Sequence, residues 1–296
     1  MQRNMQGMAL RGWLLLALAL FAGSALAAGP GAVRKQIESS LLLQGKVDIE
    51  ADGSVSRVVL DKEDRLPSGV VNFVRSSALQ WAFEPVTRDG KPVAARAPMS
   101  VRVVAKRQEG DTYQIAIRNV SFATYDERDP AAVGMLEMRP PAYPEAAFRA
   151  GAGGMVYLVV KVGRDGKPEQ AFAEQVNLQV VASGNEMQRL RDIFTKSALA
   201  AARKWTFRPP TQGEAAAEPY WIVRVPVSYS LQGNPNEGNP DDYGRWVSYV
   251  PGPRQPAPWP VPQDRAQFSP DALPGSGVYM AGRNAGPRLL TALEGG

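Results

Sequence analysis

Two short motifs recur in the same order in both halves of the chain, and this repetition constrains the fold more than any other feature. An Asp-Gly pair, Asp52-Gly53 and later Asp165-Gly166, is followed by a helical pattern that ends in Trp-x-Phe-x-Pro. That second motif spans Trp81–Pro85 in the first half and Trp205–Pro209 in the second. Two copies are too few for a solenoid, which needs at least about three repeats. The pattern therefore predicts two small domains of one kind.

The second half has the residue pattern of two strands, a helix and a closing strand. Apolar residues alternate along 156–162 and along 221–229, which is the period of a β-strand. Another strand is expected at about 168–176, after a turn at Asp165-Gly166 in which glycine takes a positive φ without steric cost. Apolar residues at helical spacing from 190 to 205 predict a helix with its last indole in the core. One helix on an antiparallel sheet of three to four strands is an α+β fold.

The first half repeats this β-β-α-β order. Strands are predicted at 41–50 and 55–60, a helix at 70–81 and a closing strand that begins near Val101. An additional strand is indicated at 113–117. We therefore expect two tandem domains of one α+β design.

The N-terminal segment has the order of a secretory signal peptide. Arg3 and Arg11 precede an apolar run from Trp13 to Ala22, and the small residues that follow end in Ala25-Leu26-Ala27. The apolar run is about ten residues long, whereas a membrane span needs about 20. We expect residues 1–27 to be a cleaved signal, and an uncleaved membrane anchor is the alternative.

These observations divide the chain into five parts. After the signal come a first domain at 32–122, a linker at 123–138, a second domain at 139–232 and a tail at 233–296. In the tail, 21 of 64 residues are Pro or Gly, a composition that disfavours a packed core. We therefore expect the tail to be mostly disordered, with its aromatic residues available to dock on a folded domain.

The chain contains no cysteine and no histidine. These absences exclude disulfides, thiolate nucleophiles, zinc ribbons and Ser-His-Asp triads. No Ser-x-x-Lys motif and no phosphate-binding glycine loop replaces them, and both Asp-Gly aspartates have the context of turns. We expect a protein that is not an enzyme and needs no cofactor or metal, with carboxylate chemistry as the remaining enzymatic alternative. The net charge of +5 is too mild to indicate nucleic-acid binding.

The second half resembles a known family. Arg139 begins an Arg-Pro-Pro-Ala-Tyr-Pro entry, Gly154-Met155-Val156 begins a strand, and an Ala-rich helix runs into Trp205. In this order, and with the closing apolar strand, these features resemble the C-terminal domain of the TonB family over Arg139 to Leu231. The first half is similar only through its hairpin, helix and Trp-x-Phe-x-Pro motif, and reads as a degenerate copy.

The resemblance implies a protein of the Gram-negative cell envelope. TonB is an inner-membrane energy transducer whose C-terminal domain captures an extended peptide of outer-membrane transporters, and the peptide adds a strand to the edge of the sheet. We therefore expect a periplasmic protein that binds transporters, their peptides or other envelope proteins through an exposed edge at 220–231. Such an edge can also pair two copies into a homodimer. The candidate partner-binding residues are Tyr143, Pro144, Trp221, Arg224, Val225 and Ser228.

Two other roles remain open. The first is a membrane-anchored, TonB-like energy transducer. Against it stand the cleavable signal, the absence of the histidine that the family's anchor carries, and the absence of a Pro-rich spacer before the domain. Pro226 in the closing strand fits an edge strand, but it removes one backbone donor from any ladder there and so counts against peptide capture in the family's unmodified form. The second alternative is a module associated with the cell wall.

Overall fold

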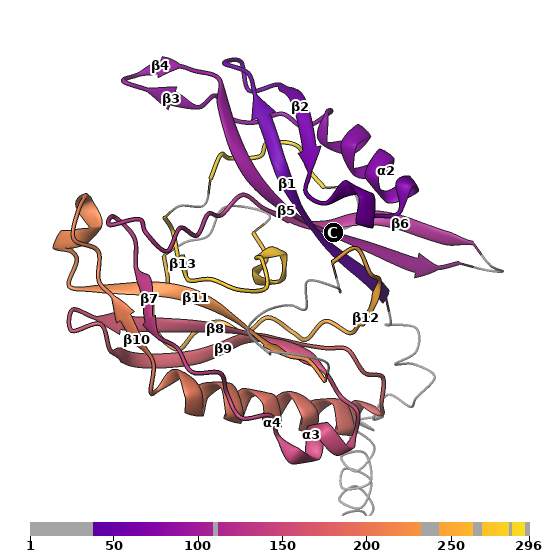
Figure 1. Cartoon of the computed structure of the whole chain (residues 1–296), viewed down its shortest axis with the longest axis vertical. Coiled ribbons are helices and arrows are strands. Elements are labelled where there is room, and N and C mark those ends of the chain that lie inside the picture. The colour runs from indigo at the N-terminus through magenta and orange to yellow at the C-terminus, as the bar shows by residue number, and fades with distance from the viewer. Residues whose placement is uncertain (1–37, 109–111, 232–242, 263–267, 284–285, 294–296) are drawn as a thin grey trace, which may run out of the picture.

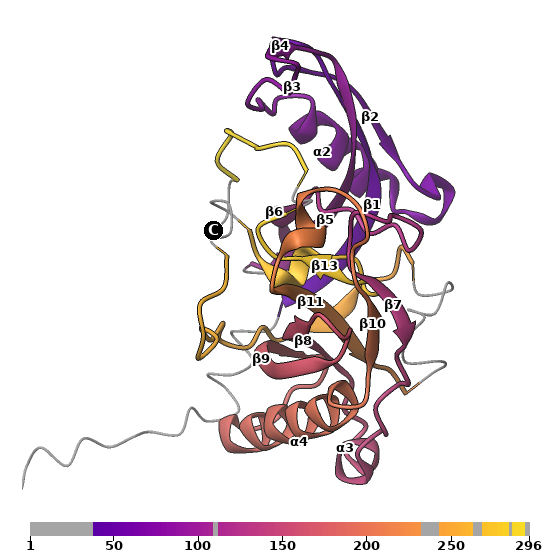
Figure 2. The same cartoon turned by 90° about the vertical axis from the view of Figure 1, so that its left-hand side faces the viewer.

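The computed structural model describes residues 38–108, 112–231, 243–262, 268–283 and 286–293, so the predicted signal peptide lies outside the described residues. Two antiparallel sheets lie one above the other, and parts of the C-terminal tail run between them (Figure 1). Figure 2 shows the same arrangement from the side, with helix α4 on the far side of the lower sheet from the tail.

The first sheet has the predicted order of elements. Strand β1 has β2 and β12 along one side and β5 along the other, and β6 follows β5. Helix α2 buries Val70, Val74 and Ala78 in the hydrophobic core that it forms with this sheet. The elements are β1 (Glu38–Ile49), β2 (Val55–Leu60), the 3-10 helix η1 (Glu63–Arg65), α2 (Ser68–Ala78), β3 (Thr87–Arg88), β4 (Lys91–Pro92), β5 (Ala95–Arg107) and β6 (Tyr113–Ser121).

The second sheet has the order β13-β11-β8-β9. Helix α4 begins where the Ser183 hydroxyl accepts a hydrogen bond from the Glu186 amide, and it buries Leu190, Phe194 and Ala198 against the sheet. The elements are β7 (Gly134–Glu137), α3 (Glu145–Arg149), β8 (Gly154–Gly163), β9 (Pro168–Leu178), α4 (Gly184–Ala202), β10 (Thr206–Arg208), the 3-10 helix η2 (Glu214–Ala217) and β11 (Tyr220–Tyr229). The prediction of tandem β-β-α-β units with an α+β fold is confirmed.

The two repeated motifs contact each other in the same way in both domains. The Phe83 amide donates a hydrogen bond of 2.8 Å to the Gly53 carbonyl, and the Phe207 amide donates one of 2.8 Å to the Gly166 carbonyl. Gly53 and Gly166 have positive φ angles of 89° and 76°. A Cβ atom on either glycine would overlap the carbonyl oxygen of the phenylalanine that it faces. The hairpin and the end of the helix therefore form one unit, which explains why the motifs occur together.

The segment expected to be a linker is packed on the second domain. Strand β7 pairs with β10, and Ala132 and Val133 belong to the core of the second sheet. Arg208 donates hydrogen bonds to the carbonyls of Glu127 and Asp129. These contacts hold residues 127–137 against β10, the strand that follows α4.

The expected disorder of the tail is wrong for its described residues. Strand β12 (Val247–Tyr249) pairs with β1, and β13 (Tyr279–Met280) pairs with β11. Between them, the Gln255 amide donates to the Glu174 carbonyl of β9. The Pro- and Gly-rich composition does leave the tail without a core of its own, but its apolar side chains, such as Leu273 and Val278, are buried against the two domains.

A buried polar cluster joins the tail to both sheets. The 3-10 helix η4 (Pro270–Ala272) carries Asp271, whose backbone carbonyl accepts a hydrogen bond of 2.7 Å from Arg102 Nε on β5. The Asp271 carboxylate accepts hydrogen bonds from Asn119 and from the Tyr249 hydroxyl. The Arg102 side chain also donates a hydrogen bond to the hydroxyl of Tyr157, which lies on β8 of the second sheet. Because buried charges need partners, this cluster fixes η4 between the sheets.

Candidate partner-binding edge of the second sheet

The closing strand β11 has an inner edge on β8 and an outer edge toward the tail. It pairs with β8 along its whole length, from Tyr220↔Gly163 to Tyr229↔Gly154. On the outer side, the Ile222 carbonyl accepts a hydrogen bond of 2.9 Å from the Ala281 amide. Backbone groups of successive strand residues point to opposite neighbours. Residues 222, 224, 226 and 228 therefore turn their backbone groups to the outer edge.

Pro226 is one of these outward-facing positions. Its missing amide therefore removes no hydrogen bond between β11 and β8, which are paired on both sides of it. The expectation that Pro226 belongs on an edge agrees with this geometry. The outer edge still offers the backbone groups of Ser228 beyond it.

The outer edge of β11 is not wholly exposed, in contrast to the sequence-based expectation. Strand β13 pairs with it at Val223↔Met280 and Arg224↔Tyr279. In the part of the chain that the structure describes, no strand pairs with β11 beyond Arg224. The corresponding strand of the first domain differs, because β6 pairs with β5 from Ser100↔Ser121 to Arg107↔Tyr113.

Trp221 and Val225 do not present their side chains at this edge. Each is 3% exposed and belongs to the core beneath α4. The Trp221 indole Nε1 donates a hydrogen bond of 2.8 Å to the Ala215 carbonyl. These two side chains pack in the core between β11 and α4, so a partner at the edge would contact the backbone of these residues and not their side chains.

Arg224 lies on the opposite face of β11 in a buried ion cluster. Its Nε is 2.7 Å from Glu174 Oε2, and Glu174 Oε1 is 2.6 Å from Arg254 Nη2 of the tail. The Phe268 ring lies 4.6 Å from the Arg224 guanidinium carbon. Ser228, farther along β11, is half-buried. The Arg224 guanidinium therefore binds within the molecule, and only the backbone of Arg224 faces the edge.

Tyr143 and Pro144 form the entry to the domain. The Tyr143 hydroxyl donates a hydrogen bond of 2.6 Å to the Ala152 carbonyl, and its ring packs edge-on against Phe194 and Tyr229. Burial raises the pKa of the Tyr143 phenol above its usual value. Pro144 directly precedes α3. The structure thus places Tyr143 next to the end of β11, where both residues fix the course of the chain.

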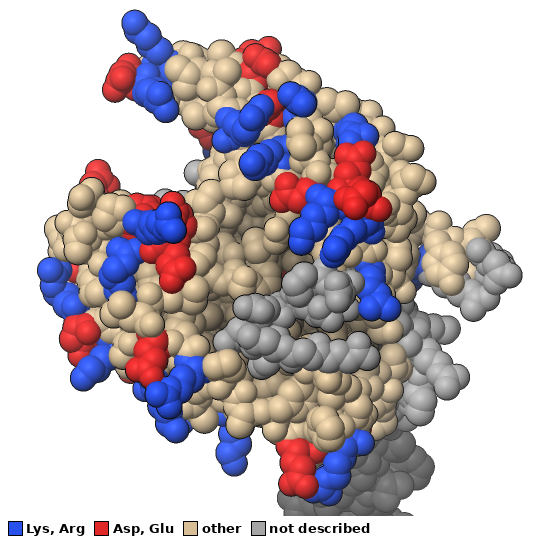
Figure 3. All heavy atoms as spheres, viewed as in Figure 1, with Lys and Arg blue, Asp and Glu red and all other residues tan. Residues whose placement is uncertain are grey.

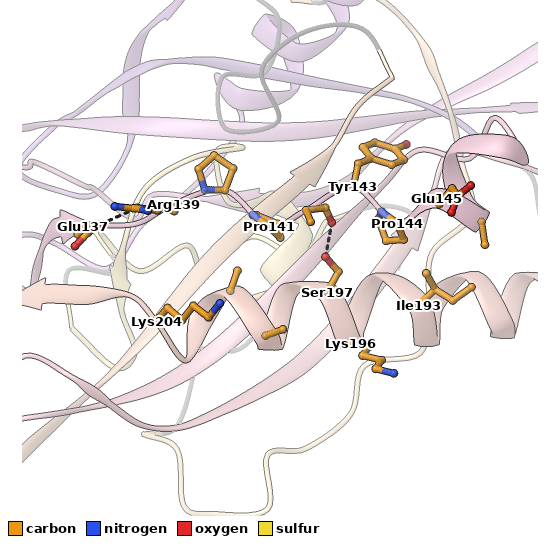
Figure 4. A pocket seen from close by; sticks show the side chains of 15 residues that line it. Glu137, Arg139, Pro141, Tyr143, Pro144, Glu145, Ile193, Lys196, Ser197 and Lys204 are labelled. Carbon is orange, nitrogen blue, oxygen red and sulfur yellow. Dashed lines mark hydrogen bonds and ion pairs between the residues drawn. The ribbon is translucent and has the colours of Figure 1, made fainter.

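The sequence did not indicate a groove that lies between the entry segment and α4 (Figure 4). Its volume is about 870 Å³. The Ser197 hydroxyl donates a hydrogen bond of 2.5 Å to the Ala142 carbonyl, and Trp205 Nε1 donates one of 3.0 Å to the Arg139 carbonyl. Lys196 and Lys204 border its apolar lining, which includes Pro141 and Ala201. Small side chains on this face of α4, Ala200 and Ala201, leave room for the groove.

The described residues contain no group of three or more acidic side chains placed to hold a metal ion. None of the helices they form is long and apolar enough to cross a membrane. On the face drawn in Figure 3, basic and acidic side chains are interspersed, so that face carries no extended patch of one sign.

Comparison with known proteins identifies the second domain. Residues 139–231 match the family model described as Gram-negative bacterial TonB protein C-terminal. Over these residues, the second domain is similar to the TonB C-terminal domain. The relatives include "Protein TonB" of two Xanthomonas campestris pv. campestris strains, B100 and ATCC 33913, each 40% identical over 100 residues. These residues are 33% of this chain and 38% of each relative, so the match spans well under half of either protein. No solved structure matches.

The match places the edge within the TonB C-terminal domain. Its bounds, 139 and 231, include the entry segment, α4 and the whole of β11. The first sheet and the tail lie outside the matched residues. The matched domain is therefore flanked by segments that the family model does not describe.

Proposed function

We propose that the TonB C-terminal domain of this chain binds an extended segment of another envelope protein by adding a strand to the outer edge of β11. The protein acts in the periplasm without enzymatic activity, and its partners are outer-membrane transporters or their peptides. The supporting observation is the pairing of β11, whose outer edge has no strand neighbour beyond Arg224 in the described residues. The family and the relatives named TonB favour partners of this kind.

The second domain is better suited to this role than the first. In the first domain, β6 pairs with most of β5 and leaves a partner strand no continuous edge. In the second domain, the two-residue β13 is the one strand that the described residues place on the equivalent edge. We therefore propose domains at 32–122 and 139–232 with different roles, in which the first supports the tail and the second binds the partner.

Main-chain hydrogen bonds supply the affinity in this proposal. A strand that pairs with β11 beyond Arg224 meets the backbone of Ser228 and the carbonyl of Pro226, which has no amide. Trp221 and Val225 contribute by holding β11 rigid from the core side. The missing donor at Pro226 limits the number of these bonds.

Ser228→Pro is the variant that tests the edge. It removes an outward-facing amide and leaves the ladder between β11 and β8 intact, whereas Val225→Pro would break that inner ladder. Loss of one hydrogen bond and the clash of the ring should weaken capture of transporter-derived peptides by about tenfold. Pull-down and titration with Ser228→Ala, which keeps the amide, provide the control. Equal retention of the peptides by Ser228→Pro and Ser228→Ala would contradict strand addition at this edge.

A membrane-anchored energy transducer is the second candidate. It is favoured by the relatives named TonB and by the apolar run from Trp13 to Ala22. Intact-mass measurement of the exported protein decides between the two forms. A mature chain that starts at Ala28 has lost this run and supports the unanchored form.

A further inference from the structure

We infer that residues 278–281, the tail strand, are an internal occupant of the first half of the β11 edge, that a partner strand must displace them to pair along the whole edge, and that their chemistry describes the partner. This inference rests on the proposed function. The tail strand contains β13 and lies against the middle of β11 (Figure 2). It thus covers the part of the edge that lies before Pro226.

The pairing of the tail strand is short. It consists of Val223↔Met280 and Arg224↔Tyr279, extended by the hydrogen bond from the Ala281 amide to the Ile222 carbonyl. Gly277 and Gly282 flank it with φ angles of 121° and 71°, which other residues rarely adopt. The inner side of β11, by comparison, pairs with β8 over ten residues. The tail strand can therefore leave the edge without opening the rest of the sheet.

Both faces of the tail strand are apolar. Val278 and Met280 are 2% and 8% exposed and complete the core beneath α4. On the other face, Ala281 packs with Val159 and Ile222. The Tyr279 hydroxyl donates a hydrogen bond of 2.6 Å to the Ser276 carbonyl, and burial raises the pKa of this phenol. The edge therefore accepts uncharged side chains on both faces of the strand that pairs with it.

A cation follows the tail strand. Arg283 Nη2 lies 3.0 Å from Glu218 Oε1, and Arg283 Nη1 lies 3.8 Å from Glu214 Oε2. Both glutamates precede β11, so an antiparallel occupant brings its C-terminal end to them. The partner that fits is an extended, apolar segment of about four residues, antiparallel to β11, with Lys or Arg about two residues after it.

The rest of the tail keeps the tail strand close after it leaves the edge. Strand β12 remains paired with β1, and Asp271 remains in its buried cluster with Arg102. A tethered segment competes at an effective concentration in the millimolar range. The apparent association constant for a partner is then the intrinsic constant multiplied by the fraction of molecules whose edge is open.

A labelled peptide with the sequence of residues 276–283 tests the inference. In Ala281→Pro, the amide that donates to Ile222 is lost, so the edge opens and the peptide should bind at least about tenfold more tightly than to the unmodified chain. Ala292→Pro, at an exposed tail residue, should bind the peptide like the unmodified chain. A peptide with proline in place of Ala281 should bind none of them. Equal peptide affinities of Ala281→Pro and the unmodified chain would overturn the inference.

Hydrogen exchange of the unmodified chain provides a second measurement that does not depend on a variant. The Ala281 amide should exchange at least about a hundredfold faster than the Val225 amide, because the tail strand opens locally. Equal protection of the two amides would overturn the inference.

Binding of transporter peptides is a separate measurement, which distinguishes failure of this inference from failure of the proposed function. If they bind the unmodified chain and Ala281→Pro equally well, the tail strand is no competitor and the proposed function stands. If only the 276–283 peptide binds Ala281→Pro, the occupant is real and the proposed partner class is wrong.

Discussion

Replacement of Glu174 by glutamine should lower the free energy of unfolding by about 3–5 kcal/mol, one of the two largest effects that we expect. Glu174 is buried and its carboxylate pairs with Arg224 of β11 and Arg254 of the tail. Glutamine keeps the shape but removes the charge, so the buried Arg224 guanidinium loses the carboxylate that it pairs with. Denaturant unfolding followed by tryptophan fluorescence measures the loss.

Glu169→Gln is the matched control. Glu169 lies on the same strand, β9, and pairs with Lys161 at 2.8 Å, but both side chains are partly exposed. Exposed ion pairs contribute about 0–1 kcal/mol, so this variant should be nearly as stable as the unmodified chain. If the two variants lost the same stability, the ion cluster would not hold the tail and β11 together.

The second large effect is expected for Gly166→Ala. The positive φ of 76° strains any residue with a Cβ atom, and that atom would also overlap the Phe207 carbonyl. Strain and displacement together should cost about 2–5 kcal/mol and loosen the contact between the hairpin and the Trp-x-Phe-x-Pro motif. The midpoint of thermal or denaturant unfolding reports the change.

Gly151→Ala separates the two contributions. Gly151 has a similar φ of 61°, but a Cβ atom there would meet open space. This variant should lose only the backbone strain of about 1–2 kcal/mol. A loss as large as that of Gly166→Ala would show that the contact with Phe207 contributes nothing, and the explanation of the repeat would fail.

Periodicity made most of the two domains predictable. Strands β8 and β11 alternate between core and outer face, and the helical spacing from Leu190 to Trp205 predicted the buried face of α4. The same alternation explains why two of the candidate partner-binding residues are buried. Trp221 and Val225 follow the apolar period and lie in the core, whereas the outward-facing backbone groups belong to the even-numbered residues.

Contacts between distant segments could not be predicted in this way. The tail has no period in its sequence, and its described strands, β12 and β13, pair with edges that other segments provide. Arg224, Glu174 and Arg254 come from three separate segments, and no spacing rule joins them. Composition describes what the tail lacks, but its partners within the chain depend on the assembled domains.

The most direct test of the central claim is amide hydrogen exchange of the protein with and without a bound transporter peptide. We predict new protection at Ser228 on the outer edge of β11, while Val225 and Val227, which face β8, are already protected in the free protein. New protection confined to the groove between the entry segment and α4, with Ser228 unchanged, would contradict it.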